Sequence, residues 1–333
     1  MARTGAANLM TNAEFIHRIV YLERESIVAD VRRPDIPHHW REYAQTRQEE
    51  VAERLSAATI AIVNKLRIEA ELLAALPELQ LIAVAATGTN NIDLDSCRAH
   101  GVVVCNIRGY AAVTVPEHVF ALILTLSRNL VAYREAVAGG RWQGAEQFCF
   151  FDFPIRDLHG ATLAVVGMGS LGAGVARLAA AFGMRVLRCE QKQARSVRLG
   201  YTDFHVALAE ADVLSLHCPL TAETTHLIDE RELRTMKRSA LLINTARGGL
   251  VNEAVLARAL REGWIAGAGF DVLTKEPPLA GNVLLAPDLL ALPNFLLTPH
   301  IAWASRPAMQ SLADQLTANL EAFARGEAQN RVV

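Results

Sequence analysis

The sequence has few cysteines and no pattern that would pair them. Five occur among the 333 residues, at positions 97, 105, 149, 189 and 218, and no two of them form a CxxC motif. An odd and scattered set is typical of reduced thiols in a cytoplasmic protein. It argues against both a disulfide framework and a zinc site, so we expect no bound metal.

Long hydrophobic runs are also missing. The longest, over 119–126, is far shorter than the roughly 20 residues that cross a membrane. The first residues lack the apolar core of a signal peptide, and residues 1–16 are expected to form a disordered extension. The charges nearly balance, with 33 Lys and Arg against 35 Asp and Glu, and no basic cluster occurs. The sequence therefore predicts neither a membrane nor a nucleic acid as partner.

What the sequence does contain is an alternation of short apolar runs with amphipathic helical patterns. Hydrophobic residues make up 51% of the chain, which at this length suits roughly two well-packed domains. Continuous apolar strands separated by helices predict parallel sheets covered on both faces, and so an α/β fold. In the first half we expect strands over 18–22, 59–63, 81–85 and 102–105, and helices over 48–57 and 69–76.

A long helical pattern over 115–138 follows, with Pro116 near its first turn, where proline is tolerated. The alternation then starts again, so we expect a boundary between the two halves near 108–113. Six more strands are predicted over 162–166, 185–189, 212–217, 240–244, 265–270 and 295–299, and a last helix over 307–324.

The second half opens on a glycine motif, Gly167-x-Gly169-x-x-Gly172, between a predicted strand and a predicted helix. In this context the first glycine permits a tight turn and the second lets the backbone approach a pyrophosphate. The third lets the helix pack closely on the strand. Glu190 ends the next predicted strand, where an acidic side chain accepts the ribose hydroxyls of a dinucleotide. The motif predicts a doubly wound Rossmann domain; the alternative is a glycine-rich turn in an ordinary βαβ unit.

Glu190 also bears on the choice of cofactor. Its carboxylate would repel the 2′-phosphate of NADP, which favours NAD. Arg188, Lys192 and Arg195 lie close to it in the sequence and can offset part of that repulsion by turning toward the phosphate. We therefore expect NAD as the cofactor, with NADP usable but weaker.

Three ionisable residues, Arg247, Glu276 and His300, each follow a predicted strand of the second half. Loops at the carboxyl ends of parallel strands converge on the ligand crevice, so the three are expected in one place. Arginine grips a carboxylate, and histidine can protonate the oxygen that hydride transfer makes anionic. A nearby carboxylate orients the imidazole, and the set as a whole fits a 2-oxo acid substrate. The alternatives are a carbonyl-capping arginine, a solvated loop glutamate and a core histidine.

Six segments resemble the D-isomer-specific 2-hydroxyacid dehydrogenases, over nearly the whole chain. They are "ATGTNNID" (86–93), "GMGSLG" (167–172), "HCPLTAETTHLID" (217–229), "INTARGGLVNE" (243–253), "GAGFDVLTKEPP" (267–278) and "TPHIAWAS" (298–305). Within the family, "NIRGYAAVTVPEHVFALILTLSRNL" (106–130) and "HIAWAS" (300–305) resemble bacterial glycerate dehydrogenases, also called hydroxypyruvate reductases. The resemblance implies NAD-dependent reduction of hydroxypyruvate to D-glycerate.

The resemblance also implies which residues form the site. Arg247 would bind the substrate carboxylate, His300 would be the acid–base group and Glu276 its partner, while Thr87 and Gly88 would contact the substrate from the other domain. The residues implied for cofactor binding are Gly167, Gly169, Ser170, Leu171, Gly172, Glu190, Cys218, Pro219, Thr224, Thr245, Ala246 and, near the nicotinamide carboxamide, Asp271.

The fold that the resemblance implies is a Rossmann nucleotide-binding domain inserted in a smaller flavodoxin-like substrate domain. This gives a nucleotide-binding domain over 113–301 and a substrate domain over 17–112 and 302–333. Members of the family are usually homodimers, which assemble through the long helix and the arm that follows it.

Two alternatives remain for the function. Glyoxylate or another 2-oxo acid is a possible main substrate within the same family. Outside enzymology, some relatives act as NAD(H)-sensing corepressors that bind protein partners, although this chain has no evident peptide-docking segment. Formate dehydrogenases share the fold but resemble Gln at the place of Glu276, which argues against them.

Overall fold

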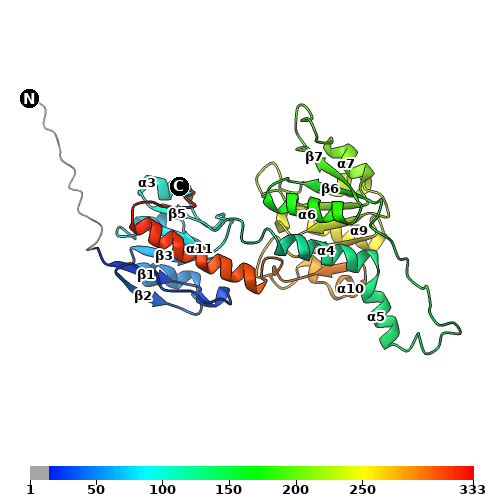
Figure 1. Cartoon of the computed structure of the whole chain (residues 1–333), viewed down its shortest axis with the longest axis horizontal. Coiled ribbons are helices and arrows are strands. Elements are labelled where there is room, and N and C mark those ends of the chain that lie inside the picture. Colours follow the sequence, from blue (N-terminus) through cyan, green and yellow to red (C-terminus); the bar gives the residue numbers. More distant parts are fainter. Residues whose placement is uncertain (1–14) are drawn as a thin grey trace, which may run out of the picture. The chain divides into compact units, whose positions relative to one another are not determined.

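The structure is a computed structural model that describes residues 15–333. These residues form two compact units (Figure 1). The first unit contains the described residues up to Tyr110 together with Ser305–Val333, and the second is Ala111–Ala304. The second unit is thus inserted in the first, with boundaries two and three residues from those expected. The extension expected over 1–16 lies outside the described residues except for Phe15 and Ile16, which are exposed.

The first unit is built on a parallel sheet with the strand order β2-β1-β3-β4-β5, the order of flavodoxin-like folds. Its strands are β1 (His17–Tyr21), β2 (His38–Glu42), β3 (Ile60–Val63), β4 (Leu81–Val84) and β5 (Val103–Cys105). Four of them lie where continuous apolar runs predict them. Strand β2 was not predicted, because this edge strand pairs only with β1 and its side chains are largely exposed, so it needs no apolar run.

The helices of the first unit are mostly short. They are η1 (Arg24–Ser26), η2 (Gln48–Glu50), α1 (Val51–Leu55), α2 (Ala70–Ala74), α3 (Leu94–Ala99) and α11 (Arg306–Ala324). The exception is α11, whose first turn is capped by the Ser305 side chain and contains Pro307, and which packs against β4. The end of the chain thereby returns to the first sheet.

The second unit contains a larger parallel sheet, with the strand order β11-β10-β9-β8-β6-β7. Its strands are β6 (Thr162–Val166), β7 (Arg185–Cys189), β8 (Val213–Leu216), β9 (Leu241–Asn244), β10 (Gly267–Phe270) and β11 (Phe295–Leu297). The first strand, β6, has β7 on one side and β8 on the other, so the winding direction changes between β6 and β8. In open α/β sheets the ligand crevice lies at this point.

Helices cover both faces of the second sheet (Figure 1). They are α4 (Thr114–Ser127), α5 (Leu130–Ala138), α6 (Ser170–Ala181), α7 (Phe204–Glu210), α8 (Glu230–Thr235), η3 (Gly248–Leu250), α9 (Glu253–Glu262), η4 (Val283–Leu285) and α10 (Pro287–Leu290). Of these, α4 packs against α6 and β10. Among residues 15–333, no helix combines the length and apolarity needed to cross a membrane.

The single helix expected over 115–138 is wrong, since the chain forms α4 and α5 with a break between them. Asn129 at the break has φ 51° and ψ 40°, in the left-handed region. Asparagine tolerates this conformation better than most residues, and its Nδ2 donates to the carbonyl oxygen of Pro154 at 2.5 Å. The break turns α5 and the segment after it away from the sheet (Figure 1).

Candidate active site

The glycine loop between β6 and α6 has the geometry expected of a dinucleotide-binding turn. Gly167 has φ 95°, and a Cβ there would lie 2.6 Å from the backbone of His217 at the end of β8. A Cβ on Gly172 would lie 2.0 Å from the carbonyl oxygen of Gly167. Both positions therefore exclude any larger residue, the first for the turn and the second for the approach of helix to strand.

Gly169 plays the third role in this loop. It is the N-cap residue of α6, has no side chain to cap the helix, and an added Cβ would meet nothing within 4 Å. The first N–H groups of a helix carry a partial positive charge and bind anions such as phosphate. The open space in front of Gly169 therefore fits a pyrophosphate.

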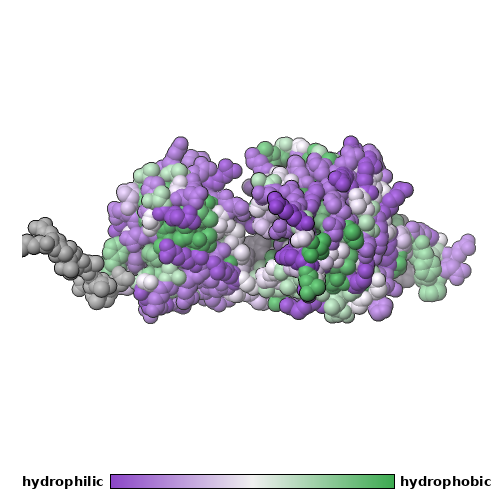
Figure 2. Space-filling model, turned by 90° about the horizontal axis from the view of Figure 1, so that it is seen from above, coloured by the Kyte–Doolittle hydropathy of each residue, from purple (hydrophilic) through white to green (hydrophobic). Residues whose placement is uncertain are grey.

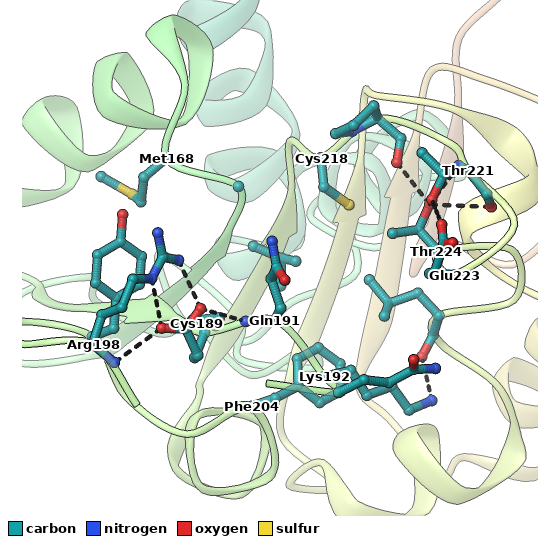
Figure 3. A pocket seen from close by; sticks show the side chains of 17 residues that line it. Met168, Cys189, Gln191, Lys192, Arg198, Phe204, Cys218, Thr221, Glu223 and Thr224 are labelled. Atoms are coloured by element: carbon teal, nitrogen blue, oxygen red, sulfur yellow. Dashed lines mark hydrogen bonds and ion pairs between the residues drawn. The ribbon is translucent and has the colours of Figure 1, made fainter. Parts of the chain in front are cut away.

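A pocket of about 610 Å³ lies beside this loop (Figure 3). Five of the residues predicted to bind the cofactor line it: Gly167, Glu190, Cys218, Pro219 and Thr224. The other predicted cofactor-binding residues do not line it, and neither do Arg247, Glu276 and His300. The pocket thus covers the ends of β6, β7 and β8, where the adenosine half of a dinucleotide is expected.

Glu190 lines this pocket and is only 3% exposed. Its carboxylate is held by Arg198, whose Nε and Nη2 each donate to one carboxylate oxygen at 2.7 Å (Figure 3). These hydrogen bonds, with those of backbone N–H groups, lower the pKa of Glu190 to about 2. Arg198 was not predicted as a partner of Glu190, because it lies eight residues away and nothing in the sequence signals the pairing.

The three ionisable residues follow neighbouring strands that end in register. Asn244 of β9 pairs with Leu216 of β8 and with Phe270 of β10, and Phe270 pairs with Leu297 of β11. The loops after β9, β10 and β11 therefore leave the sheet at the same edge, as the sequence analysis expected. These loops carry Arg247, Glu276 and His300, respectively.

Arg247 is half-buried in a loop that Asn244 shapes. The side chain of Asn244 accepts from the N–H of Ala246 at 3.1 Å and donates to the carbonyl oxygen of Arg247 at 2.8 Å. Asn244 is fully buried, so these bonds are shielded from water. Asn244 was not among the predicted site residues, although a polar residue at the end of a buried apolar strand is a usable signal.

Glu276 and His300 form a direct hydrogen bond, from Nδ1 of the imidazole to Oε2 of the carboxylate, at 2.5 Å. The second oxygen of Glu276 accepts from the N–H of Leu273 at 2.8 Å. Both side chains keep partial contact with solvent, with exposures of 27% for His300 and 32% for Glu276. An imidazole held in this way presents Nε2 to a ligand and is a suitable acid–base group.

Asp271 ties the backbone of the loop that carries His300. Its carboxylate accepts from the hydroxyl of Thr298 at 2.5 Å and from the N–H groups of Ile301 and Ala302 at 2.9 and 2.8 Å. His300 itself has φ 55°, a conformation that needs such support in a residue other than glycine. Asp271 was expected near the nicotinamide of the cofactor. In this structure its carboxylate also has a structural role, because it holds the loop that carries His300.

Three more of the predicted residues, Thr245, Cys218 and Thr87, lie in the loops after β9, β8 and β4, respectively. The hydroxyl of Thr245 is buried and, within the described residues, has no hydrogen-bond partner, which fits a site that a ligand completes. Burial raises the pKa of the Cys218 thiol to about 11, so it is neutral. In the first unit, Thr87 donates to the carbonyl oxygen of Ile107 at 2.7 Å, and Gly88 follows it in the loop after β4. No cluster of the described residues is suited to hold a metal ion.

Comparison with known proteins completes the description. The family model for the NAD binding domain of D-isomer specific 2-hydroxyacid dehydrogenases matches residues 120–302. The chain is 49% identical to a glycerate dehydrogenase of Methylorubrum extorquens, over 95% of this chain and 98% of that protein. It is 39% identical to a glyoxylate reductase of Korarchaeum cryptofilum, over 86% of each.

Among solved structures, a D-lactate dehydrogenase from Aquifex aeolicus complexed with NAD and lactic acid is similar to this chain. The TM-score is 0.76 and the identity 28%, over 93% of this chain and 96% of that one. The open cradle at Gly169 and the unpartnered hydroxyl of Thr245 fit the NAD that the family binds. The family expected from the motifs is confirmed: the chain belongs to the D-isomer specific 2-hydroxyacid dehydrogenases and is an NAD-dependent dehydrogenase.

Proposed function

We propose that the protein reduces hydroxypyruvate to D-glycerate with NADH and catalyses the reverse reaction with NAD. The observation that carries the proposal is the hydrogen-bonded pair of His300 and Glu276, in a cluster of loops that also carries Arg247. The similarity to a glycerate dehydrogenase supports the choice of substrate.

Arg247 is proposed to hold the substrate carboxylate. A guanidinium group matches a carboxylate with two parallel hydrogen bonds and also polarises the neighbouring carbonyl. Its Nη1 donates to the carbonyl oxygen of Ala246 at 2.7 Å, which orients the group and leaves Nε and Nη2 outside that bond.

His300 is proposed as the acid–base group and Glu276 as the residue that positions it. NADH, when bound, supplies the hydride that adds to C2 of the substrate. Charged His300 gives the proton on Nε2 to the oxygen that becomes anionic, while Nδ1 stays bonded to Glu276. In the direction of oxidation, neutral His300 takes that proton back.

Other residues are proposed to hold the cofactor and the rest of the substrate. Thr87 and Gly88 are proposed to contact the substrate. The proposed cofactor-binding residues are Gly167, Gly169, Ser170, Leu171, Gly172, Glu190, Cys218, Pro219, Thr224, Thr245, Ala246 and Asp271. The pocket beside Gly167 and the open cradle at Gly169 support the assignment of the phosphate and adenosine end.

Glyoxylate is the second candidate substrate, because a relative with 39% identity is named a glyoxylate reductase. The test is turnover of hydroxypyruvate, glyoxylate, pyruvate and phenylpyruvate with NADH. We expect hydroxypyruvate to give the highest kcat/KM, since a site that bonds its C3 hydroxyl rejects an analogue that lacks it. A higher value for glyoxylate would move the assignment to that substrate, and no turnover of any 2-oxo acid would favour an NAD(H)-sensing binding protein instead.

The same assay tests the residues. Arg247→Ala is expected to lower kcat/KM by on the order of 100-fold or more through the lost charged hydrogen bonds, and His300→Ala by about 10²–10⁴-fold. Binding of NADH should stay nearly unchanged in both. Arg231→Ala, which removes an exposed arginine of α8, is the matched control and should behave like the parent. Near-full activity of either active-site variant would refute its role.

We also propose a homodimer in the cytoplasm. The arm formed by α5 and residues 139–157 carries exposed hydrophobic side chains, with Phe148 at 87% and Phe151 at 82% exposure. Hydrophobic residues are visible on the arm at the right of Figure 2, and such a surface is typical of an interface. The five free cysteines support a reducing compartment.

A further inference from the structure

The carboxylate of Glu190 has little capacity left to accept hydrogen bonds from a ribose. Its Oε1 accepts from the N–H of Gln191 at 2.9 Å and from Nη2 of Arg198 at 2.7 Å. Its Oε2 accepts from the N–H of Arg198 at 3.1 Å and from Nε of the same residue at 2.7 Å. An ionised carboxylate offers about four acceptor positions, and here four donors occupy them. Glu190 therefore differs from the free ribose acceptor that its position predicts.

Arg198 is held firmly in place at this pair. Its guanidinium stacks on the ring of Tyr201, with the central carbon 3.9 Å from the ring centroid. The segment that carries it is closed by two backbone bonds, from Glu190 to Thr202 and from Thr202 to Arg188, each 2.8 Å long. The ion pair uses Nε and Nη2, so Nη1 lies outside it, and 58% of the side chain remains exposed.

The cation that pairs with Glu190 is thus Arg198. It is none of the three basic residues that were expected there because they lie close in the sequence, namely Arg188, Lys192 and Arg195. Lys192 donates to the carbonyl oxygen of Leu227 and pairs with Glu232, each at 3.0 Å, at another part of the pocket. Arg198 and Glu190 both line the pocket, and together they carry no net charge. A 2′-phosphate placed there would meet a neutral pair with an exposed guanidinium, and not a bare carboxylate.

We propose that Arg198 sets the cofactor specificity, because it neutralises Glu190 and so lets the pocket accept the 2′-phosphate of NADP(H) as well as the 2′-hydroxyl of NAD(H). This inference rests on the proposed function, as it concerns the cofactor of the same reaction. Nη1 of Arg198 is the donor available to the phosphate, and Tyr201 keeps the guanidinium in the pocket. Without the Arg198 side chain the carboxylate would keep only two backbone donors and an uncompensated charge, so it could accept from ribose hydroxyls and would repel the phosphate.

The test is equilibrium binding of NADH and NADPH, measured separately by calorimetry at one fixed ionic strength and without substrate. The parent should bind both. Arg198→Ala should raise the ratio of the NADPH to the NADH dissociation constant about tenfold or more, because a charge-assisted hydrogen bond is lost and a carboxylate is exposed. Arg177→Ala, which removes an exposed arginine of α6 outside the pocket lining, is the matched control and should leave the ratio unchanged.

A second variant makes the test independent of how well the first one folds. Glu190→Gln removes the charge that Arg198 compensates, so it should tighten NADPH binding several-fold relative to NADH and restore part of the NADPH affinity of Arg198→Ala. A parent that does not bind NADPH overturns the proposal, as does an Arg198→Ala protein whose ratio stays within about threefold of the parent's. Failure of the proposed function would look different, since both cofactors would bind while hydroxypyruvate was not turned over.

Discussion

Gly248, directly after Arg247, offers a sharp test of how the active-site loops depend on one another. It is buried, and an added Cβ would lie 2.0 Å from the carbonyl carbon of Leu273 and 2.2 Å from the backbone nitrogen of Thr274. These backbone atoms belong to the loop that leads to Glu276. No side-chain rotation can relieve the contact, so Gly248→Ala must separate the loop of Arg247 from the loop of Glu276.

The size of the effect follows from the distances. Ordinary van der Waals contact of a Cβ begins at 3.4 Å, so the backbones must part by about 1.4 Å to accept the methyl group. A displacement of about 1 Å in a catalytic constellation costs on the order of 100-fold in rate. Overpacking at a buried position also costs about 1–3 kcal/mol of the free energy of unfolding. We therefore expect Gly248→Ala to fold, to unfold at lower temperature and to lose on the order of 100-fold in kcat/KM.

The assay is kcat/KM for hydroxypyruvate, measured alongside NADH binding and thermal unfolding. The adjacent Gly249→Ala is the matched control, because the three atoms nearest to its Cβ all belong to the side chain of Leu220, the nearest at 3.1 Å, and that side chain can move. Its kcat/KM should stay within a few-fold of the parent's. Equal activities for the two variants would show that contact between these loops does not position the active site.

Burial lowers the pKa of His217 to about 4, so folded His217 stays neutral while the unfolded chain binds a proton below its ordinary value of 6.5. Stability from this residue is complete above pH 6.5 and is lost as the pH falls to 4, by about 3 kcal/mol; urea unfolding of His217→Asn across this range should show a smaller loss. Thr298→Val removes one hydrogen bond to Asp271 and should lower kcat more than it weakens NADH binding, whereas a change in binding alone would place Asp271 at the cofactor only. Replacing Phe148 and Phe151 by Ser should shift the protein from dimer to monomer in light scattering, and an unchanged mass would exclude the arm as the interface.

Much of the fold follows from the sequence because both sheets are parallel and covered on both faces. Such strands are continuous apolar runs, and β6 and β7 begin and end where their runs do. The same reasoning brings the loops that carry Arg247, Glu276 and His300 to one edge of the sheet, since parallel strands in register end there together. The pair of Glu276 and His300, 2.5 Å apart across 24 residues, is the direct outcome.

Two features of the fold, the edge strand β2 and the break between α4 and α5, could not be predicted from the sequence. Strand β2 is largely exposed and carries no apolar run, so no hydrophobic pattern predicts it. The break at Asn129 depends on a bond to Pro154, 25 residues later, while the local helical pattern continues across it. Local sequence carries neither kind of information, because both depend on what lies beside the segment after folding.

Asp271 and Glu190 show that the sequence does not predict which groups bind to an acidic residue at a strand end. A carboxylate there can accept hydrogen bonds from a ligand or from the protein, and the chemistry of the two is the same. In this chain Asp271 accepts from Thr298, Ile301 and Ala302, and Glu190 accepts from Gln191 and Arg198. Each carboxylate therefore holds a loop of the proposed binding site in shape, in addition to any direct contact with the ligand. Substitution at either position must change loop geometry as well as contacts, so binding and turnover need to be measured separately to assign its role.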